Sequence, residues 1–522
     1  MRAVYCAYID FANNRSQMFK DNGEFQEFDG FDLIKHIDCS DCVVFVNNLK
    51  VLANLFPGGK KYGENYKKLS LDRSDLLEYY VKKENSKKNE HISFRSFSAL
   101  IGMEAIECLN DMFPNTAIPV AMYEYLKRFG EPHKIRHTLA SNTKKIFYAP
   151  IKDELWEETK ENKHYYYDFE TYKHMYAGNK AGILSKHEFK TFSGMLSFDK
   201  HSAFPSILIN CDMFPIGKVT KSKPSYQLAK AHIIDALNNR EWIKVIINAK
   251  INGLFSWYDM DQKVTALDIA NIASIYKLGM IDVLFDAIKN NDFIIYRTQK
   301  QGYVAKAFRD RLVDAYAKKA VLKKGTFERF LEKTMLDMLY GKGIQDHDFQ
   351  DIEEVQKHFR GRGDNYMDPA WSNLLRGMVE YEIICAVVDN GYTFADVYAD
   401  TDGIKLPDTP QVREYFKKQN ERIIEANRRS GYDIDIGIWD LEAEIEELYV
   451  IKPKIYCFNT KNHEFECKHA GVRQCDIDTI FNKLKGIELE HIKKNGFPFV
   501  QHTYVFIDGK FEERFIFTIM KG

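Results

Sequence analysis

Two aspartates stand at the tip of a predicted hairpin in residues 393–407, TFADVYADTDGIKLP. Apolar residues flank the turn-rich letters DTDG, which carry Asp400 and Asp402. Strand residues two positions apart project to one face, about 6.6 Å from each other along the chain. Two carboxylates so placed repel each other unless a cation lies between them. Because most DxDG strings are ordinary turns, the pair predicts a metal site only together with further carboxylates.

A third aspartate follows a second apolar stretch, MLSFDKHSAFPSIL at residues 195–208. The apolar letters predict a strand that delivers Asp199 to its C-terminal end, and HSAFPS predicts a sharp turn in which Pro205 fixes one backbone torsion. A two-metal site for phosphoryl transfer needs carboxylates from separate strands, because ions about 3.5–4 Å apart must be bridged from both sides. Asp199 with Asp400 and Asp402 therefore predicts such a site.

A charged stripe lies along a predicted helix at residues 326–343, TFERFLEKTMLDMLYGKG. Apolar side chains recur at helical spacing and predict the buried face, which leaves another stripe of Arg329, Lys333, Asp337 and Tyr340. The two basic side chains could hold a triphosphate, and the tyrosine could lie against a base pair. For this helix alone, a solvated charged face is an equally good interpretation.

The elements that must position these residues are mixed along the chain. Strand-like and helix-like stretches are interspersed without regular βαβ alternation, which indicates an α+β fold with subdomains. The lysine-rich residues 58–90 indicate either a solvated face or a DNA-contacting surface. The main predicted elements are a small α/β unit at residues 1–55, strands with an amphipathic helix at 218–310, a helical tract at 306–342, and hairpins at 393–407 and 449–459.

The composition is that of an ordinary globular protein. A length of 522 residues predicts several domains or subdomains. The 74 basic and 75 acidic side chains give no overall electrostatic argument for nucleic acid, so any basic groove must be local. Nine scattered cysteines fit a reducing cytosol better than a disulfide framework, and Cys39 and Cys42 lack two further zinc ligands. Neither a secretory signal nor a stretch of about 20 apolar residues is present, so we expect no membrane partner.

Taken together and in order, the motifs resemble those of family B DNA polymerases, in particular the protein-primed branch of phages and linear plasmids. FDKHSAFPSIL is similar to the family's motif A (D-x-x-S-L-Y-P), KTMLDMLYGK to motif B (K-x-x-x-N-S-x-Y-G) and YADTDG to motif C (Y-x-D-T-D-S). IKPKIY resembles the K-x-Y motif, KHAGV the lysine-bearing start of the thumb, and YAGNKAG the Y-x-G-G segment. The resemblance covers about residues 165–480.

The resemblance implies a role for each matching residue. It makes Asp199 and Asp402 the principal ligands of two Mg²⁺ ions, with Asp400 in support, and lets Mn²⁺ substitute. Phe204 takes the aromatic position that blocks the sugar 2′-hydroxyl. The further nucleotide contacts are Ser202, Arg329, Lys333 and Tyr340, and the DNA contacts are Tyr176, Gly178, Lys454, Tyr456 and Lys468.

Several positions depart from the family pattern. Asp337 replaces the motif B asparagine and adds negative charge where a triphosphate is expected. Ala203 and Phe204 replace leucine and tyrosine, which loosens the nucleotide pocket and removes a hydroxyl group. Gly403 replaces the serine of motif C, and Asn179 replaces the second glycine of Y-x-G-G.

The letters DFET at Asp168–Thr171 have the spelling that opens a proofreading exonuclease. Asp168 lies only 31 residues before Asp199. In the family the first exonuclease motif lies near the N-terminus, and the second motif and a third aspartate follow it before the polymerase, so no exonuclease can fit between Asp168 and Asp199. VNNLKVLANL at residues 46–55 resembles the second exonuclease motif but lacks its aspartate. We therefore interpret DFET as a chance match and the N-terminal region as an exonuclease-like remnant without its catalytic carboxylates.

The resemblance implies a right-hand polymerase with an N-terminal α/β remnant. Its parts would be the remnant (1–115), a connecting segment (116–190), the palm (191–217 and 370–460), a priming-protein-type insertion (218–305), the fingers (306–345), a reduced second insertion (346–369) and the thumb (461–522).

The implied function is a cytoplasmic, DNA-directed DNA polymerase without proofreading, which acts in the host cytoplasm if a phage encodes it. Its partners would be primer–template DNA, dNTPs and a priming terminal protein. A template-independent or atypically primed nucleotidyltransferase is the nearest alternative, and a catalytically silent binder of nucleic acid or replication proteins is an alternative of another class.

Overall fold

The protein is described by a computed structural model and has a mixed α+β fold, as the sequence predicts. Its chain divides into two compact units. The first consists of residues 1–146, 472–485 and 498–518, and the second of 147–471, 486–497 and 519–522. The structure describes residues 2–10, 13–31, 33–37, 41–47, 49, 66–69, 76–81, 90–97, 100, 109, 112–135, 139–160, 168–178, 183–251, 264–323, 326–343, 349–360, 366–469, 489–507 and 510–520.

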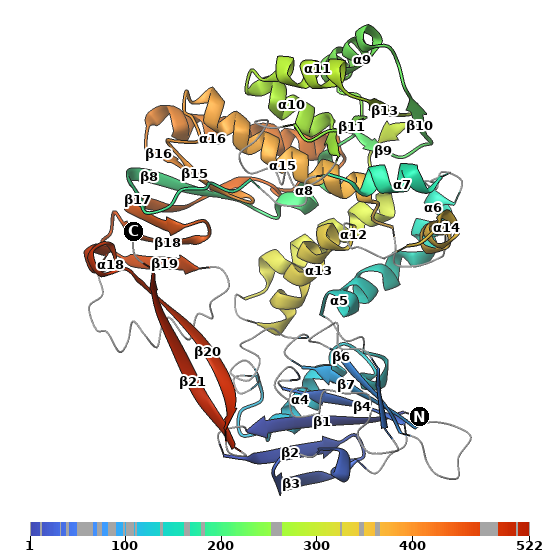
Figure 1. Cartoon of the computed structure of the whole chain (residues 1–522), viewed down its shortest axis with the longest axis vertical. Coiled ribbons are helices and arrows are strands. Elements are labelled where there is room, and N and C mark those ends of the chain that lie inside the picture. The colour runs from blue at the N-terminus through green and yellow to red at the C-terminus, as the bar shows by residue number, and fades with distance from the viewer. Residues whose placement is uncertain are drawn as a thin grey trace. The chain divides into compact units, whose positions relative to one another are not determined.

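The first unit is built on a seven-stranded mixed sheet in the order β3-β2-β1-β4-β7-β6-β5 (Figure 1). The central strands β1, β4 and β7 run parallel, and the outer neighbours are antiparallel. Valine, isoleucine and phenylalanine side chains fill the core, as expected for strands buried on both faces. The elements are β1 Ala3–Asp10, β2 Arg15–Lys20, β3 Phe25–Asp29, η1 Leu33–His36, β4 Asp41–Val46, β5 Tyr66–Leu69, β6 Leu76–Val81, β7 Glu90–Ser96, α4 Ile118–Lys127 and η2 Pro132–Lys134.

The candidate site lies on a six-stranded antiparallel sheet of the second unit, in the order β15-β16-β8-β17-β18-β19. Helices cover one face, where Phe198 stacks on Phe416 with 3.8 Å between ring centroids. Both predicted hairpins are confirmed. The elements are β8 Lys190–Lys200, α8 Ala203–Asn210, α15 Pro369–Asp389, β15 Tyr398–Asp400, β16 Gly403–Pro407, α16 Pro410–Arg429, β17 Trp439–Lys452, β18 Ile455–Thr460 and β19 Phe465–His469.

A separate four-stranded sheet in the second unit has the order β10-β13-β11-β12 and carries three helices (Figure 1). It confirms the strands and the amphipathic helix expected within residues 218–310. A short pairing of β9 with β14 closes the base of this segment. The elements are β9 Phe214–Pro215, β10 Val219–Ser222, α9 Tyr226–Asn239, β11 Ile243–Ile247, β12 Thr265–Asp268, α10 Ile269–Lys277, α11 Ile281–Asn290, β13 Phe293–Thr298 and β14 Gln301–Gly302.

The helical tract expected at residues 306–342 is two helices, α12 Lys306–Val321 and α13 Phe327–Gly343. They pack against each other and against α8 and α15 of the sheet layer. The other elements are α5 Leu139–Tyr148, η3 Ala149–Ile151, α6 Lys152–Thr159, α7 Phe169–Tyr176, α14 Ile352–Arg360, α18 Leu489–Asn495, β20 Phe497–Ile507 and β21 Lys510–Met520.

The cysteines differ in one respect from the expectation. Cys457 and Cys467 face each other in register on β18 and β19 and form a disulfide, because strand pairing brings their sulfur atoms together. Cys42 is buried, whereas Cys39 lies outside the described residues. None of the helices in the described ranges is both long and apolar enough to span a membrane.

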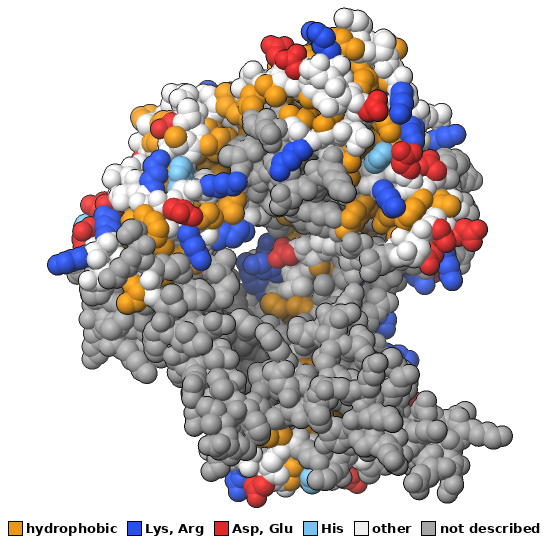
Figure 2. All heavy atoms as spheres, viewed as in Figure 1, with side chains coloured by type: hydrophobic (Ala, Val, Ile, Leu, Met, Phe, Trp, Pro, Cys, Tyr) orange, Lys and Arg blue, Asp and Glu red, His pale blue; other side chains and the backbone are white. Residues whose placement is uncertain are grey.

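Basic and acidic side chains are interspersed with hydrophobic ones over the coloured surface in Figure 2. This distribution agrees with the near-zero net charge of the sequence. A nucleic-acid site on this chain must therefore arise from local geometry rather than from the overall field.

Candidate active site

The strand register brings the predicted carboxylates to one end of the six-stranded sheet. Asp400 pairs with Gly403 across β15 and β16, and Gly403 pairs with Asp199 across β16 and β8. Residues directly opposite each other in a sheet project to the same face. Asp402 lies in the two-residue turn of the hairpin, and its carbonyl accepts a hydrogen bond of 3.2 Å from the backbone N–H of Lys200. Asp199 thus meets Asp400 and Asp402, which are far from it in the sequence, at one end of the sheet.

The chain turns sharply just after Asp199, as predicted, although Pro205 does not lie in the turn. Ser202 adopts a left-handed conformation with φ of 49°, and α8 begins at the next residue, Ala203. Pro205 therefore lies in the first turn of α8, where its missing N–H costs no helical hydrogen bond.

The carboxylates of Asp199 and Asp402 are poorly compensated. Burial, followed by the charges of Asp402 and Glu442, raises the pKa of Asp199 to about 7. Burial also raises the pKa of Asp402, and the charge of Asp400 adds to the effect. Asp400 itself pairs with the ammonium group of Lys454 at 3.1 Å. Neighbouring carboxylates whose pKa values are raised by burial and by mutual repulsion are stabilised when a cation binds to them.

The donor set suits a hard divalent cation in its chemistry. Carboxylate oxygens are the ligands that Mg²⁺ prefers, and Asp199 and Asp402 supply them from two separate chain segments. Within the described ranges, no three His, Cys, Asp or Glu side chains already form a metal-binding group. The carboxylate oxygens of Asp199 and Asp402 thus fit the expected ions in type. In the described part of the chain they form a pair and not a complete set of metal ligands.

Gly403 leaves space beside the carboxylate of Asp199. A Cβ atom at this position would lie 3.3 Å from Oδ1 of Asp199, which is tighter than an ordinary contact. The serine of the family pattern would therefore press on the carboxylate, whereas glycine leaves room for its rotation.

Lys319 is a candidate functional residue that the sequence reasoning missed. It lies on α12, and its Nζ donates a 3.0 Å hydrogen bond to Oγ of Ser202, three residues after Asp199. Burial lowers the pKa of Lys319, opposed by the charge of Asp337. In the sequence, the only signal for Lys319 is its position near the end of the helical stretch that precedes motif B.

The charged residues predicted to line one stripe of α13 have different surroundings in the structure. Lys333 and Asp337 are exposed, and their charges act on the neighbouring Lys319. Arg329 instead binds structurally: its Nη1 donates to the carbonyl oxygens of Leu322, at 2.9 Å, and Lys319. A cation at the C-terminal end of α12 satisfies carbonyls that lack helical partners. The backbone of Tyr340 belongs to α13, but its side chain lies outside the description.

Phe204 lies on the first turn of α8, beside a buried cation. The guanidinium carbon of Arg376 is 5.8 Å from the centroid of its ring, within the range of a cation–π contact. Arg376 comes from α15, and its charge partly opposes the rise in the pKa of Asp402 that burial causes. The predicted sugar-facing ring and the predicted metal ligand therefore share one neighbour.

The K-x-Y residues lie at the turn between β17 and β18. The backbone N–H of Lys454 donates a 2.9 Å hydrogen bond to the hydroxyl of Tyr398, and the Tyr456 ring packs edge-on against Tyr398 with 5.0 Å between centroids. Lys468 lies directly opposite Tyr456 on β19 and pairs with Glu466 at 3.4 Å. Strand pairing thus brings three of the five predicted DNA contacts, Lys454, Tyr456 and Lys468, close together, and Lys454 also pairs with Asp400.

The Tyr176–Gly178 segment begins at the last residue of α7 and is held by two side chains. Lys244 and Asn373 both donate to the carbonyls of Met175 and Ala177, at distances between 2.6 and 3.3 Å. A Cβ atom at Gly178 would lie 2.7 Å from Oδ1 of Asn373, so that only glycine fits. Asn179 lies outside the described residues.

Both carboxylates of DFET have structural partners. The side chain of Asp168 caps the N-terminus of α7 and accepts hydrogen bonds from N and Oγ1 of Thr171, at 2.7 and 2.9 Å. Glu170 pairs with Lys221. Asp168 therefore marks the start of a helix.

A carboxylate that the sequence reasoning passed over ends β1 in the first unit. Asp10 is followed by Phe11 and Ala12, so that the spelling D-x-E is D-x-A here. Its oxygens accept hydrogen bonds from the backbone and side-chain nitrogens of Asn13, at 3.1 and 2.7 Å. One carboxylate cannot by itself hold two metal ions.

Comparison with known proteins gives matches only at the level of structure. Neither protein-family models nor curated proteins match the chain. Phi29 DNA polymerase matches over 100% of both chains: its complex with single-stranded DNA has a TM-score of 0.67 and 12% identity, and its binary complex with primer–template DNA has 0.66 and 13%. The ternary complex with primer–template DNA and incoming nucleotide has a TM-score of 0.64 and 12% identity. The chain therefore has a fold similar to that of Phi29 DNA polymerase.

Proposed function

We propose that the chain is a DNA-directed DNA polymerase that uses two divalent cations and can start from a protein hydroxyl. The observation that carries this proposal is that Asp199 and Asp402 lie together at one end of the sheet. Lys319 is hydrogen-bonded to Ser202, in the turn that follows Asp199. The similarity of fold to Phi29 DNA polymerase, a protein solved with primer–template DNA and nucleotides, supports it.

In this proposal Asp199 and Asp402 hold Mg²⁺, or Mn²⁺ in its place, with Asp400 in support. Such ions activate the attacking hydroxyl and neutralise the leaving pyrophosphate. Lys319 and Lys333 bind the triphosphate as point charges. Arg329 contributes indirectly, by fixing the end of α12 from which Lys319 projects.

The remaining predicted residues would orient the sugar, base and primer. Phe204 lies under the sugar and excludes a 2′-hydroxyl, while Tyr340 contacts the nascent base pair. Lys454, Tyr456 and Lys468 hold the primer terminus through its backbone. Tyr176, at the end of α7, and Gly178, just after it, would contact the DNA.

The departures from the family pattern keep a second activity open. Asp337 brings a carboxylate to the neighbourhood of Lys319 and Asp402, where the family has a neutral asparagine. That charge favours a nucleotidyltransferase with altered template use or priming. A catalytically silent binder would not need the uncompensated pair of Asp199 and Asp402.

Primer extension by the purified protein tests the proposal. With primed template, dNTPs and Mg²⁺, the protein should extend the primer, whereas Asp199→Asn and Asp402→Asn should lose activity by a factor on the order of 10³ or more and still bind DNA. Asp433→Asn is the matched control, because Asp433 is exposed and forms an ion pair with Arg428.

Each outcome distinguishes between the functions. Extension that follows the template sequence supports a DNA-directed polymerase, and addition without a template supports the alternative transferase. Equal activity in wild type and Asp199→Asn would refute the site, and DNA binding without any incorporation would favour the silent binder.

A further inference from the structure

A buried lysine lies on the same face of the sheet as the carboxylates. Lys405 follows Gly403 by two positions on β16, and strand residues two apart share a face. Its register partners are Tyr398 and Ser197, which lie one row below Asp400 and Asp199. Lys405 is only 7% exposed.

Two aromatic rings hold the ammonium group of Lys405. Its Nζ lies 5.5 Å from the ring centroid of Tyr398 and 4.7 Å from that of Tyr456. The two rings pack edge-on, and the hydrogen bond from the backbone of Lys454 fixes the Tyr398 hydroxyl. In the described part of the chain, no carboxylate lies within ion-pairing distance of Nζ. The rings therefore take the place of a direct counter-ion.

The ammonium group nevertheless interacts with the acidic site. Burial lowers the pKa of Lys405 to about 8, and the charges of Glu442, Asp400 and Asp199 oppose this change, in that order. The charged form therefore still prevails at neutral pH. In a region of low dielectric constant, such a cation attracts the carboxylates above it and repels any further cation that they bind.

We propose that Lys405 is the built-in counter-charge of the Asp199 and Asp400 row, and that it weakens the binding of divalent cations until a triphosphate is present. Lys405 is a positioning residue: it lies one row below the carboxylates and touches Tyr456, which is predicted to hold the primer. The triphosphate adds the negative charge that offsets the ammonium group, so that metal and nucleotide bind together. This inference rests on the proposed metal-dependent function.

Binding of Mn²⁺ to the full chain, followed by electron paramagnetic resonance without DNA or nucleotide, tests this role. Lys405→Met removes the charge and keeps most of the stem, so it should bind Mn²⁺ about tenfold more tightly than wild type. Lys405→Arg retains the charge and should stay close to wild type. A purely structural role for Lys405 predicts the opposite, because a disturbed site binds the ion more weakly. Unchanged or weaker binding by Lys405→Met overturns the proposal.

Asp199→Asn separates this inference from the function on which it rests. If wild type and Asp199→Asn bind Mn²⁺ equally, the carboxylate site itself is refuted. If only wild type binds and Lys405→Met binds no more tightly, the counter-charge alone is refuted.

A second measurement tests the coupling to nucleotide. Addition of a dNTP should tighten Mn²⁺ binding by a larger factor in wild type than in Lys405→Met, and equal factors overturn the coupling. Thermal unfolding verifies that each variant is folded, and Lys405→Gln provides the same test if the methionine variant is not.

Discussion

At the scale of single residues, the candidate site carries more negative charge than its neighbouring cations offset. Asp400 pairs with Lys454, whereas burial raises the pKa of Asp199 and of Asp402 although the charges of Lys405 and Arg376 oppose the rise. Lys319 supplies positive charge from another element and reaches the turn after Asp199 through Ser202. The negative site and its basic neighbour are together suited to a metal-bound triphosphate.

Lys319 and its neighbour Lys318 allow a matched test of this role. Lys319→Met should lower kcat/KM for the incoming dNTP by about ten- to a hundredfold, because one charge-assisted phosphate contact is lost. The affinity for primer–template DNA should change little. Lys318→Met should have almost no effect, since Lys318 is exposed and pairs with Asp314. Steady-state kinetics and DNA titration measure both quantities, and similar effects of the two variants would remove Lys319 from the site.

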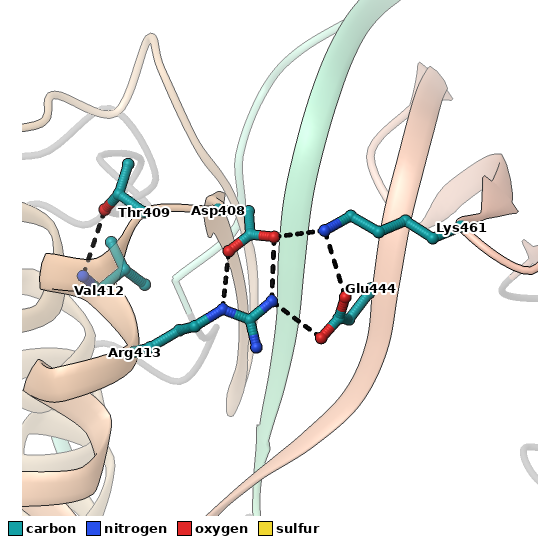
Figure 3. Close-up of polar contacts among 6 residues, drawn as sticks. All are labelled: Asp408, Thr409, Val412, Arg413, Glu444 and Lys461. Atoms are coloured by element: carbon teal, nitrogen blue, oxygen red, sulfur yellow. Dashed lines mark hydrogen bonds and ion pairs between the residues drawn. The ribbon is translucent and has the colours of Figure 1, made fainter.

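At the scale of elements, a network of ion pairs joins the strands behind the site (Figure 3). The carboxylate of Asp408, just after β16, accepts two hydrogen bonds from Arg413 of α16, at 2.8 and 2.9 Å, and one of 2.5 Å from Lys461. Arg413 and Lys461 also bind Glu444 of β17, at 2.8 and 3.2 Å. Thr409 caps α16 by accepting from the backbone N–H of Val412. The network therefore ties the first turns of α16 to the end of β16 and to β17.

This network predicts a pH-dependent contribution to stability. Hydrogen bonds from Arg413, followed by Lys461, lower the pKa of Asp408 to about 2. A carboxyl group with a depressed pKa stabilises the folded state above its unfolded pKa of about 4 and loses this contribution as the pH falls toward 2. Because the surrounding groups are partly solvated, Asp408→Asn should cost about 1 kcal/mol at pH 7.

Urea unfolding of wild type and Asp408→Asn between pH 7 and pH 2 measures this effect. The difference in midpoint should be constant above about pH 5 and shrink below about pH 4. Asp433→Asn provides the control, because it breaks a single exposed pair and should give a small difference. A difference for Asp408→Asn that grows on acidification would contradict the assignment.

At the scale of the whole molecule, the four-stranded segment at residues 218–305 is a compact addition between motifs A and B. In the family that the sequence resembles, an insertion at this place grips the priming protein. We predict that Asp286→Lys and Lys289→Glu, on the exposed side of α11, reduce initiation on a partner protein at least tenfold but spare extension of a DNA primer. Both substitutions are at exposed positions and should leave the fold intact.

Protein-linked and DNA-primed synthesis can be measured in parallel with labelled nucleotides. A variant with charge reversals on the exposed side of α16, such as Glu414→Lys, is the control for nonspecific electrostatic effects. Equal loss of both activities, or a lack of any protein-linked product in wild type, would count against protein priming and leave the polymerase assignment standing.

The whole chain should also lack proofreading. Asp168 caps a helix, and Asp10 accepts hydrogen bonds from Asn13 and is followed by Ala12 where the D-x-E spelling has glutamate. The purified protein should not shorten mismatched 3′ ends in the presence of Mg²⁺. Degradation that disappears in Asp10→Ala would place an exonuclease in the first unit, and degradation that disappears in Asp168→Ala would show that DFET is functional.

The sequence by itself determined the local elements that carry the chemistry. Alternating apolar letters and a DTDG turn predicted the hairpin of Asp400 and Asp402, and an apolar run with a sharp turn predicted the strand that ends at Asp199. Hydrophobic periodicity and turn chemistry act over a few residues, so a single stretch of sequence contains the necessary information. The α+β class followed from the same patterns.

Only the tertiary structure decided which side chains meet. Strand register placed Gly403 beside Asp199, and helix packing placed Lys319 within hydrogen-bonding distance of Ser202. Arg329, which was predicted to contact phosphate, instead binds carbonyl oxygens at the end of α12. The structure also made Asp168 a helix cap and paired Cys457 with Cys467. These outcomes depend on contacts between residues distant in the chain, because register and packing are set by the fold as a whole and no local pattern encodes them.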